Sequence, residues 1–214
     1  MRISETLGLM HEARRGFRQR LFHTRLMCDV ETVMAKDPAS PNLAYALTHQ
    51  GLHAIWLYRA AHLLHQRRRR LLARGVAYLA RVVTGIDLHP GAELGSGVFI
   101  DHGCGVVIGE TAVLEDDVML YHNVTVGSVG WWHPKVVEGR RHPVIQQGSV
   151  LCTGALILGP VVVGRDCVVG ANAVVLADLP GHSQLSPGTV WRGNSPQRAT
   201  EQVTLPRNSL GEVL

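Results

Sequence analysis

The sequence is poor in aromatic residues, which make up only 5% of its 214 positions. So few rings exclude a globular core built around large aromatic side chains. Glycine, by contrast, is abundant, with 23 residues. Many glycines and few rings are typical of a repetitive, turn-rich core of small aliphatic side chains. A hydrophobic content of 46% predicts one sizeable domain, with or without a small helical cap.

Long apolar runs are also missing. No stretch approaches the ~18 consecutive apolar residues of a transmembrane helix. The N-terminal segment MRISETLGLMHEARRGFRQR has neither the apolar core nor the small-residue cleavage site of a signal peptide. We therefore expect a cytoplasmic protein. The formal net charge of +4 permits a phosphate-bearing ligand without requiring one.

Residues 1–83 show the periodicity of α-helices. The segment DPASPNLAYAL contains turn-forming residues and a helix start around Asp37 to Asn42. Apolar residues at three- and four-residue steps predict one helix over 51–66 and a second over 71–83. Four consecutive arginines, 67–70, separate them. We interpret these arginines as a solvated turn, because no aromatic residues alternate with them to favour nucleic acid.

From Ile86 onward the apolar period changes to six. Four residues after most of these apolar anchors comes a small or β-branched residue, and this second set includes Cys104 and Cys167. Hexapeptide repeats are typical of a parallel β-helix, in which three hexads close one triangular coil. A β-sandwich would instead alternate with a period of two. The anchors are Leu88, Leu94, Ile100, Ile108, Leu114, Leu120, Val126, Ile145, Leu151, Ile157, Val163, Val169 and Val175.

The four cysteines form no CxxC pair, which predicts free thiols that pack as small hydrophobic residues in a reducing compartment. Cys104 and Cys167 lie on the repeat, so both are expected to face the interior.

Two irregularities interrupt the repeat. Ile100 and Ile108 are eight residues apart, so two extra residues must bulge out beside Asp101 and His102. The region of about 127–144 lacks the repeat altogether and predicts a protruding loop. Because side chains in regular coils serve packing, we expect the polar chemistry at these two departures.

His102 is a candidate general base. A carboxylate bonded to one ring nitrogen leaves the other nitrogen as the acceptor, and Asp87, about one coil earlier, is a candidate partner. A solvated surface histidine is the alternative. His142 lies beside Arg140 and Arg141 in the long loop, where it would recognise a carboxylate or phosphate, or belong to a solvated basic loop.

A zinc site is a competing interpretation. His62 and His65 form an HxxH pair, and His102 and His122 are twenty residues apart. However, HxxH on an apolar helix is typical of packing, and the second pair matches no ligand spacing that we can defend. We therefore expect no metal.

Longer motifs carry a resemblance to a known family. The stretch IDLHPGAELGSGVFIDHGCGVVIGETAV, with GRRHPVI and GANAVVLADLPGHS, resembles the serine O-acetyltransferases of cysteine biosynthesis. The segments DVETVMAKDPAS and GLHAIWLYRAAHLL are similar to that family's N-terminal region. The resemblance runs from about Asp29 to Arg198. It implies an α+β fold, with an N-terminal helical region (1–83), a left-handed parallel β-helix acyltransferase domain (84–198) and a C-terminal tail (199–214).

The resemblance implies acetyl-CoA as donor, L-serine as acceptor and no metal. It implies His102 as general base and Asp87 as its partner. Small residues along a prism edge would let the pantetheine arm approach. Those expected there are Gly127, Thr153, Gly154 and Ala171.

For the zwitterionic acceptor, the resemblance implies that Asp37 and Asp101 hold the ammonium group. It implies that Arg141 and His142 hold or orient the carboxylate, and it favours His142 over His133 for this role. This division is physically coherent, because an ammonium group requires carboxylates and a carboxylate requires an arginine.

The resemblance further implies a homotrimer with active sites between subunits, and a dimer of trimers as a larger assembly. The family's C-terminal Ile, which docks the next enzyme of the pathway, cysteine synthase, is absent from the ending GEVL, which argues against that complex. Trp131 and Trp132 in the long loop motivate an alternative, the same reaction on a serine-like acceptor such as homoserine or with a bulkier acyl donor. Outside this class, a γ-carbonic-anhydrase-like zinc protein and a non-catalytic β-helix scaffold stay open.

Overall fold

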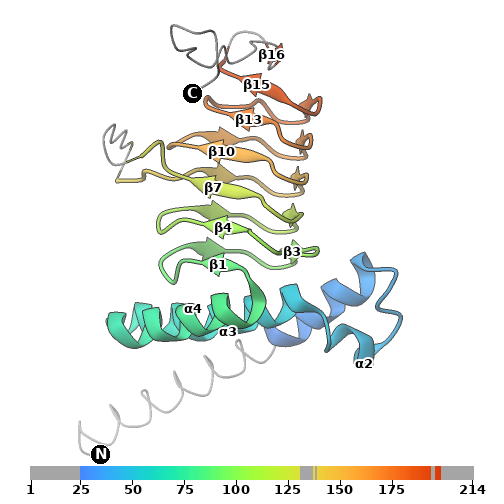
Figure 1. Cartoon of the computed structure of the whole chain (residues 1–214), viewed down its shortest axis with the longest axis vertical. Helices are drawn as coiled ribbons and strands as arrows, with labels where there is room; N and C mark the ends of the chain where they lie inside the picture. The colour runs from blue at the N-terminus through green and yellow to red at the C-terminus, as the bar shows by residue number, and fades with distance from the viewer. Residues whose placement is uncertain (1–24, 131–136, 138, 194–195, 199–214) are drawn as a thin grey trace, which may run out of the picture.

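A group of helices lies at one end of a triangular prism of short parallel strands (Figure 1). The structure is a computed structural model that describes residues 25–130, 137, 139–193 and 196–198. Within the described part of the chain, no helix is both long and apolar enough to span a membrane. Residues 25–36 are helical, and α2 (Leu43–Ala46), α3 (Gln50–Gln66) and α4 (Arg70–Thr84) follow.

The prism has three walls, because consecutive strands pass in turn to three different sheets. All strand pairs are parallel except the last, between β15 and β16. The first wall contains β1 (Asp87–Leu88), β4 (Val107–Ile108), β7 (Thr125–Gly127), β10 (Leu156–Leu158), β13 (Val174–Val175), β15 (Thr189–Trp191) and β16 (Pro196–Arg198). The second contains β2 (Glu93–Leu94), β5 (Val113–Leu114), β8 (Val144–Ile145) and β11 (Val162–Val163). The third contains β3 (Phe99–Ile100), β6 (Met119–Leu120), β9 (Val150–Leu151), β12 (Val168–Val169) and β14 (Gln184–Leu185).

The predicted fold is confirmed, a helical region followed by a left-handed parallel β-helix. Every predicted anchor is buried in the prism, with an exposed fraction of 7% or less. Each two-residue strand turns its anchor inward and its preceding residue outward, as β5 does with Leu114 and Val113. The stacked coils thus bury a continuous column of aliphatic side chains.

The first coil is longer than its neighbours. Asp87 of β1 lies opposite Val107 of β4, twenty residues later, whereas Val107 lies opposite Thr125 of β7, only eighteen residues later. The two extra residues lie in the corner between β3 and β4. The predicted bulge beside Asp101 and His102 is therefore present.

The bulge corrects the prediction for Cys104. We expected this thiol to face the interior, but it is exposed. Val106, which is 0% exposed, takes the inward position two residues before Ile108. Cys167 is buried as predicted.

The helices join at the arginine run. Arg67 ends α3, Arg68 has a positive φ of 60°, and Arg69 precedes α4, so these residues form the predicted turn. Closer to the prism, Arg59 of α3 forms a buried bidentate ion pair with Asp29, at 2.6 and 2.7 Å. This pair ties the helix of residues 25–36 to α3.

The N-terminus of α3 lies against the end of β3. A β-carbon at Gly51 would lie 2.2 Å from the carbonyl oxygen of Ile100, so only glycine permits this approach. The contact brings residues 37–50 beside the bulge that follows Ile100.

Candidate active site

His102 lies at a corner that glycine makes possible. Its φ is 58°, in the left-handed region, and Gly103 and Gly105 also have positive φ. Histidine tolerates this region better than most residues, and two nearby glycines allow the sharp turn. The His102 side chain is 74% exposed, and its Nε2 lies 3.8 Å from Oδ1 of Asp101. The corner therefore presents an imidazole and a carboxylate to solvent.

A cavity of about 300 Å³ lies beside this corner. The turn of residues 37–42 and the start of α3 form its other side. Asp37 accepts hydrogen bonds from the Ala39 N–H at 2.8 Å and the Ser40 hydroxyl at 2.7 Å. The cavity is lined by Asp37, Ala39, Ser40, Tyr45, Thr48, His49, Gln50, Asp101 and His102.

The charge of this cavity is set by its two carboxylates. The Ser40 hydrogen bond lowers the pKa of Asp37, against a smaller effect of burial, so Asp37 is an anion at neutral pH. Three residues predicted from the sequence, Asp37, Asp101 and His102, are therefore brought together around one cavity. Such a site attracts a cation next to a group that can accept a proton.

His49 also lines this cavity, and the sequence analysis missed it. Its ring stacks on Phe99, with centroids 5.3 Å apart, and its Nδ1 accepts a hydrogen bond from the Leu52 N–H at 3.3 Å. The only sequence signal was its place just before the helical pattern begins. Histidine is not among the usual N-cap residues, so that signal was too weak to use.

No hydrogen bond or ion pair joins the side chains of Asp87 and His102 in the described part of the chain. The Oδ2 of Asp87 instead lies 3.3 Å from Nη1 of Arg81. Asp87 is nevertheless close to the His102 corner, because its N–H bonds to the Val106 carbonyl at 2.9 Å and the Gly105 N–H bonds to the Gly85 carbonyl at 3.1 Å. Residues 85–87 thus lie one coil below the end of the bulge.

Arg141 and His142 form a second group with the GETAV motif. Arg141 pairs with Glu110 at 2.9 Å. The Nδ1 of His142 accepts a hydrogen bond from the Thr111 N–H at 3.1 Å, and the Thr111 hydroxyl lies 2.9 Å from the same atom. Glu110 and Thr111 belong to the GETAV motif, but nothing in the sequence alone indicated these contacts.

His142 is buried, with an exposed fraction of 6%. Burial, reinforced by the Arg141 charge and opposed by Glu110, lowers the pKa of His142. Since Nδ1 is occupied as an acceptor, the neutral ring carries its proton on Nε2. His142 is therefore a neutral donor beside a guanidinium, a combination that suits a carboxylate ligand.

The two groups lie at opposite edges of one wall. His102 precedes β4, whereas Glu110 and Thr111, which hold Arg141 and His142, follow it. Within the described ranges, no hydrogen bond or ion pair joins the His102 group to the Arg141 group. One chain therefore does not complete a site that contains both.

The small residues expected to border CoA also divide between these edges. Thr153, Gly154 and Ala171 lie in the corners that follow β9 and β12, on the edge that carries His102. The Gly154 N–H bonds to the His122 carbonyl at 3.0 Å, and the His122 ring lies 6.0 Å from that of His102. Gly127 ends β7, on the other edge.

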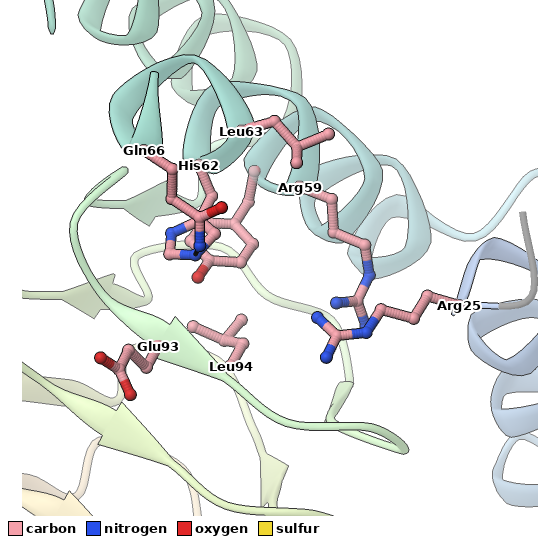
Figure 2. Close-up of a pocket in the computed structure, with 8 residues that line it drawn as sticks. Arg25, Arg59, His62, Leu63, Gln66, Glu93 and Leu94 are labelled. Carbon is pink, nitrogen blue, oxygen red and sulfur yellow. Dashed lines mark hydrogen bonds between the residues drawn. The ribbon is translucent and has the colours of Figure 1, made fainter. Parts of the chain in front are cut away.

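A second cavity, of about 400 Å³, lies between α3 and the first coil (Figure 2). Several of its polar groups are already engaged. Arg59 pairs with Asp29, and the His62 Nδ1 bonds to the Pro90 carbonyl at 2.8 Å. Within the described residues, no three His, Cys, Asp or Glu side chains converge on a possible metal position. Trp131, Trp132 and His133 lie outside the described residues.

A hexapeptide β-helix with an imidazole at a glycine-rich corner and carboxylates beside it defines a hexapeptide-repeat acyltransferase. Serine acetyltransferase of Helicobacter pylori is 49% identical over 156 residues, which cover 72% of this chain and 88% of that protein. The chain belongs to the serine acetyltransferase family. No model of a protein family matches the sequence.

Solved structures agree with this assignment. The serine acetyltransferase of Brucella abortus in complex with coenzyme A superposes with a TM-score of 0.72 and 34% identity, over 90% of this chain and 71% of that one. The Neisseria gonorrhoeae serine acetyltransferase in complex with serine superposes with a TM-score of 0.71 and 32% identity, over 83% and 69%.

Proposed function

We propose that this protein transfers the acetyl group of acetyl-CoA to the hydroxyl of L-serine, with His102 as the general base. The observation that carries the proposal is the cavity in which Asp37, Asp101 and His102 meet. The family relationship supports the reaction, and the CoA and serine complexes of the related proteins support the two substrates.

The reaction needs a base because a neutral hydroxyl is a weak nucleophile. His102 takes the serine hydroxyl proton while the oxygen bonds to the thioester carbon. The tetrahedral intermediate then expels the CoA thiolate, which recovers the proton from the imidazolium. A positioned base of this kind typically contributes ~10²–10⁴-fold. The products are O-acetylserine and CoA, and no covalent enzyme intermediate forms.

Asp37 and Asp101 are the proposed ligands of the serine ammonium group. Both carboxylates line the cavity with His102, and hydrogen bonds to Asp37 occupy only one lone pair on each of its oxygens. Two anions beside the base favour an acceptor that carries an amine next to its hydroxyl. This charge requirement separates amino-acid acceptors from sugars.

Asp87 is the proposed partner that orients His102. Its ion pair with Arg81 occupies Oδ2 and leaves Oδ1 available, and its backbone lies one coil below the bulge. A carboxylate bonded to one ring nitrogen fixes the tautomer in which the other nitrogen accepts a proton.

Arg141 and His142 are the proposed ligands of the serine carboxylate, supplied by a neighbouring subunit. In a ring of three chains, one edge of each prism meets the other edge of the next, because cyclic assemblies with more than two members use two different surface patches. That arrangement would bring Arg141 of one subunit to His102 of its neighbour. We therefore propose a homotrimer with three shared sites.

The exposed face of α4 supports such an assembly. The side of α4 that packs on its own chain consists of small residues, Ala73, Ala80 and Thr84. Its large apolar side chains point outward, with Leu79 53% exposed and Val83 64%. Helix α4 leads into β1, the first strand of the wall between the two site edges. A second copy of this chain is the occupant that would cover α4 and complete the site at once.

Acetyl-CoA is proposed to lie along the edge above His102. Thr153 and Gly154 lie two coils above His102 on that edge, beyond the coil of His122, and Ala171 lies one coil further, where small side chains leave room for a pantetheine arm. Gly127 lies on the opposite edge, so in the trimer it would border the same channel from the neighbouring subunit.

Release of free CoA tests the reaction. Wild-type protein is assayed with L-serine, homoserine, threonine and a sugar as acceptors, and with acetyl-CoA and a bulkier acyl-CoA as donors. We expect acetyl-CoA and L-serine to give the highest kcat/KM. Activity with only the sugar would contradict the proposed ammonium site, and a preference for homoserine or the bulkier donor would replace serine acetylation by that related reaction.

The role of His102 is tested with His102→Asn, since asparagine also tolerates a positive φ. We expect kcat to fall ~10²-fold or more. His182→Asn is the matched control. His182 also has a positive φ, of 61°, and its Nδ1 lies 3.7 Å from Oδ2 of Asp166, but it occupies another corner. Equal activities of the two variants would remove His102 from the role of base.

A further inference from the structure

His49 places a further ionisable group in the proposed ammonium site. It lines the same cavity as Asp37, Asp101 and His102. The stacking of its ring on Phe99 and the hydrogen bond from the Leu52 N–H hold it in place. Both contacts orient the His49 ring, and neither takes part in the proton transfer proposed for His102.

The N-cap contact fixes the charge and tautomer of this ring. Nδ1 accepts the Leu52 N–H, so Nδ1 carries no proton and the neutral ring carries its proton on Nε2. Protonation of Nδ1 would convert this acceptor into a donor and oppose two N–H groups. Capping thus favours the neutral ring.

The surroundings act in both directions. Burial lowers the pKa of His49 below its ordinary value of 6.5, and the positive charges of His102 and His53 reinforce that direction. Asp37 and Asp101 oppose it. At neutral pH the ring is uncharged, and the two carboxylates keep their full attraction for a cation.

We infer that His49 is a positioning residue that sets the charge of the ammonium site, so that a proton on its ring and the substrate's ammonium group compete. This inference rests on the proposed function. A protonated His49 would place a cation beside the same two carboxylates, within the site that serine must enter. The ring thereby makes binding of the amino-acid acceptor depend on pH, apart from the protonation of the base itself.

The direction of the effect follows from linkage. At pH values above the lowered pKa of His49, the ring is neutral and does not compete with serine. As the pH falls through the lowered pKa of His49, the KM for serine rises, toward about tenfold per pH unit. By reciprocity, bound serine lowers the pKa of His49 further.

The test compares wild type with His49→Asn and His49→Gln between pH 5 and 8. Both substitutions keep a side-chain oxygen for the N-cap and remove the titration, and asparagine is among the preferred N-caps. The ratio of wild-type to variant KM for serine is plotted against pH, which cancels the protonation of His102. We expect this ratio to rise as the pH falls below 6.5, with no matching change in the ratio of kcat values.

His53→Gln is the control, because His53 lies on the same helix but bonds to the Leu47 carbonyl at 2.7 Å outside the cavity. It should keep the rise of the serine KM on acidification, moved to slightly higher pH because the His53 charge no longer opposes protonation of His49. A second readout is the NMR titration of the His49 ring, whose pKa should fall when serine is added. A KM ratio that stays constant with pH, or a ring pKa that serine does not move, overturns the inference. Absence of wild-type turnover with serine at pH 8 would instead overturn the proposed function.

Discussion

The imidazole of His142 lies directly against Gly109, so close that a β-carbon at Gly109 would be 2.1 Å from its Cδ2. Gly109 does not adopt a positive φ, so alanine is compatible with its backbone there. The substitution Gly109→Ala would therefore act mainly by displacing the His142 ring.

We expect Gly109→Ala to raise the KM for serine roughly tenfold or more, since hydrogen bonds to charged groups contribute about 1.5–3 kcal/mol. The KM for acetyl-CoA should change less. Gly181→Ala is the control, because a β-carbon at that position, which does not adopt a positive φ, would come no closer than 3.4 Å to its neighbours. Steady-state kinetics measures both, and an unchanged serine KM in Gly109→Ala would argue against His142 as a carboxylate ligand.

Stability should decrease below neutral pH. Burial is the main cause that lowers the pKa values of His49, His89 and His142, so the folded state binds these protons more weakly than the unfolded chain does. Their contribution is complete above the unfolded pKa of 6.5 and is lost as the pH falls through the lowered values.

The measurement is the denaturant midpoint at fixed protein concentration from pH 8 to 5. We expect the midpoint to fall below pH 6.5, and to fall less steeply in His142→Gln, which does not titrate. A midpoint that rises on acidification would contradict the burial of these rings.

Val106, and not Cys104 as the repeat predicted, is the residue that faces inward after the bulge, and this difference can be tested. Val106 is fully buried two residues before Ile108, whereas Cys104 is exposed. Val106→Ala should lower the free energy of unfolding by about 2 kcal/mol, because it leaves a cavity in a packed coil. Cys104→Ala should change it by less than about 0.5 kcal/mol. If chemical denaturation gave the opposite order, Cys104 rather than Val106 would be the inward residue, as an uninterrupted six-residue repeat predicts.

The sequence predicted the fold well because the repeat records burial residue by residue. Each aliphatic anchor, from Leu88 to Val175, points into the prism, and the extra residues beside His102 were visible as a change in spacing. The position of Cys104 could not be found in the same way. The spacing shows that two residues are inserted between Ile100 and Ile108, but it does not show which residue then returns to the interior.

The site was predicted less completely because contacts across the fold have no period. Motifs indicated His102, Asp101 and Asp37, and the cavity brings these together. The approach of His49 depends on Gly51 touching Ile100, a tertiary contact between distant segments. The present pairing of Asp87 with Arg81 likewise depends on where α4 ends, which no motif specifies.

The outward apolar face of α4 predicts that assembly can be broken at one position. Leu79→Glu would place a carboxylate on this face without disturbing the chain's own core, since Leu79 is 53% exposed in the single chain. We expect a monomer by sedimentation velocity, with a helical circular dichroism spectrum and little activity. Arg74→Glu, on the arginine-bearing side of α4, should remain trimeric. If Leu79→Glu remained a trimer, the outward face of α4 would have no role in assembly.

The proposed sharing of the site between neighbouring subunits predicts rescue between two inactive variants. The His102→Asn variant lacks the base, and the Arg141→Ala variant lacks the carboxylate ligand. A trimer of either variant alone therefore has no intact site. A mixed trimer contains one interface at which an intact His102 faces an intact Arg141. Random reassembly of equal amounts should therefore restore about a quarter of the wild-type activity in a cyclic trimer. If each chain supplied both residues to its own site, mixing would restore nothing, so co-refolding the two variants and measuring CoA release decides whether the two edges of the wall meet across subunits.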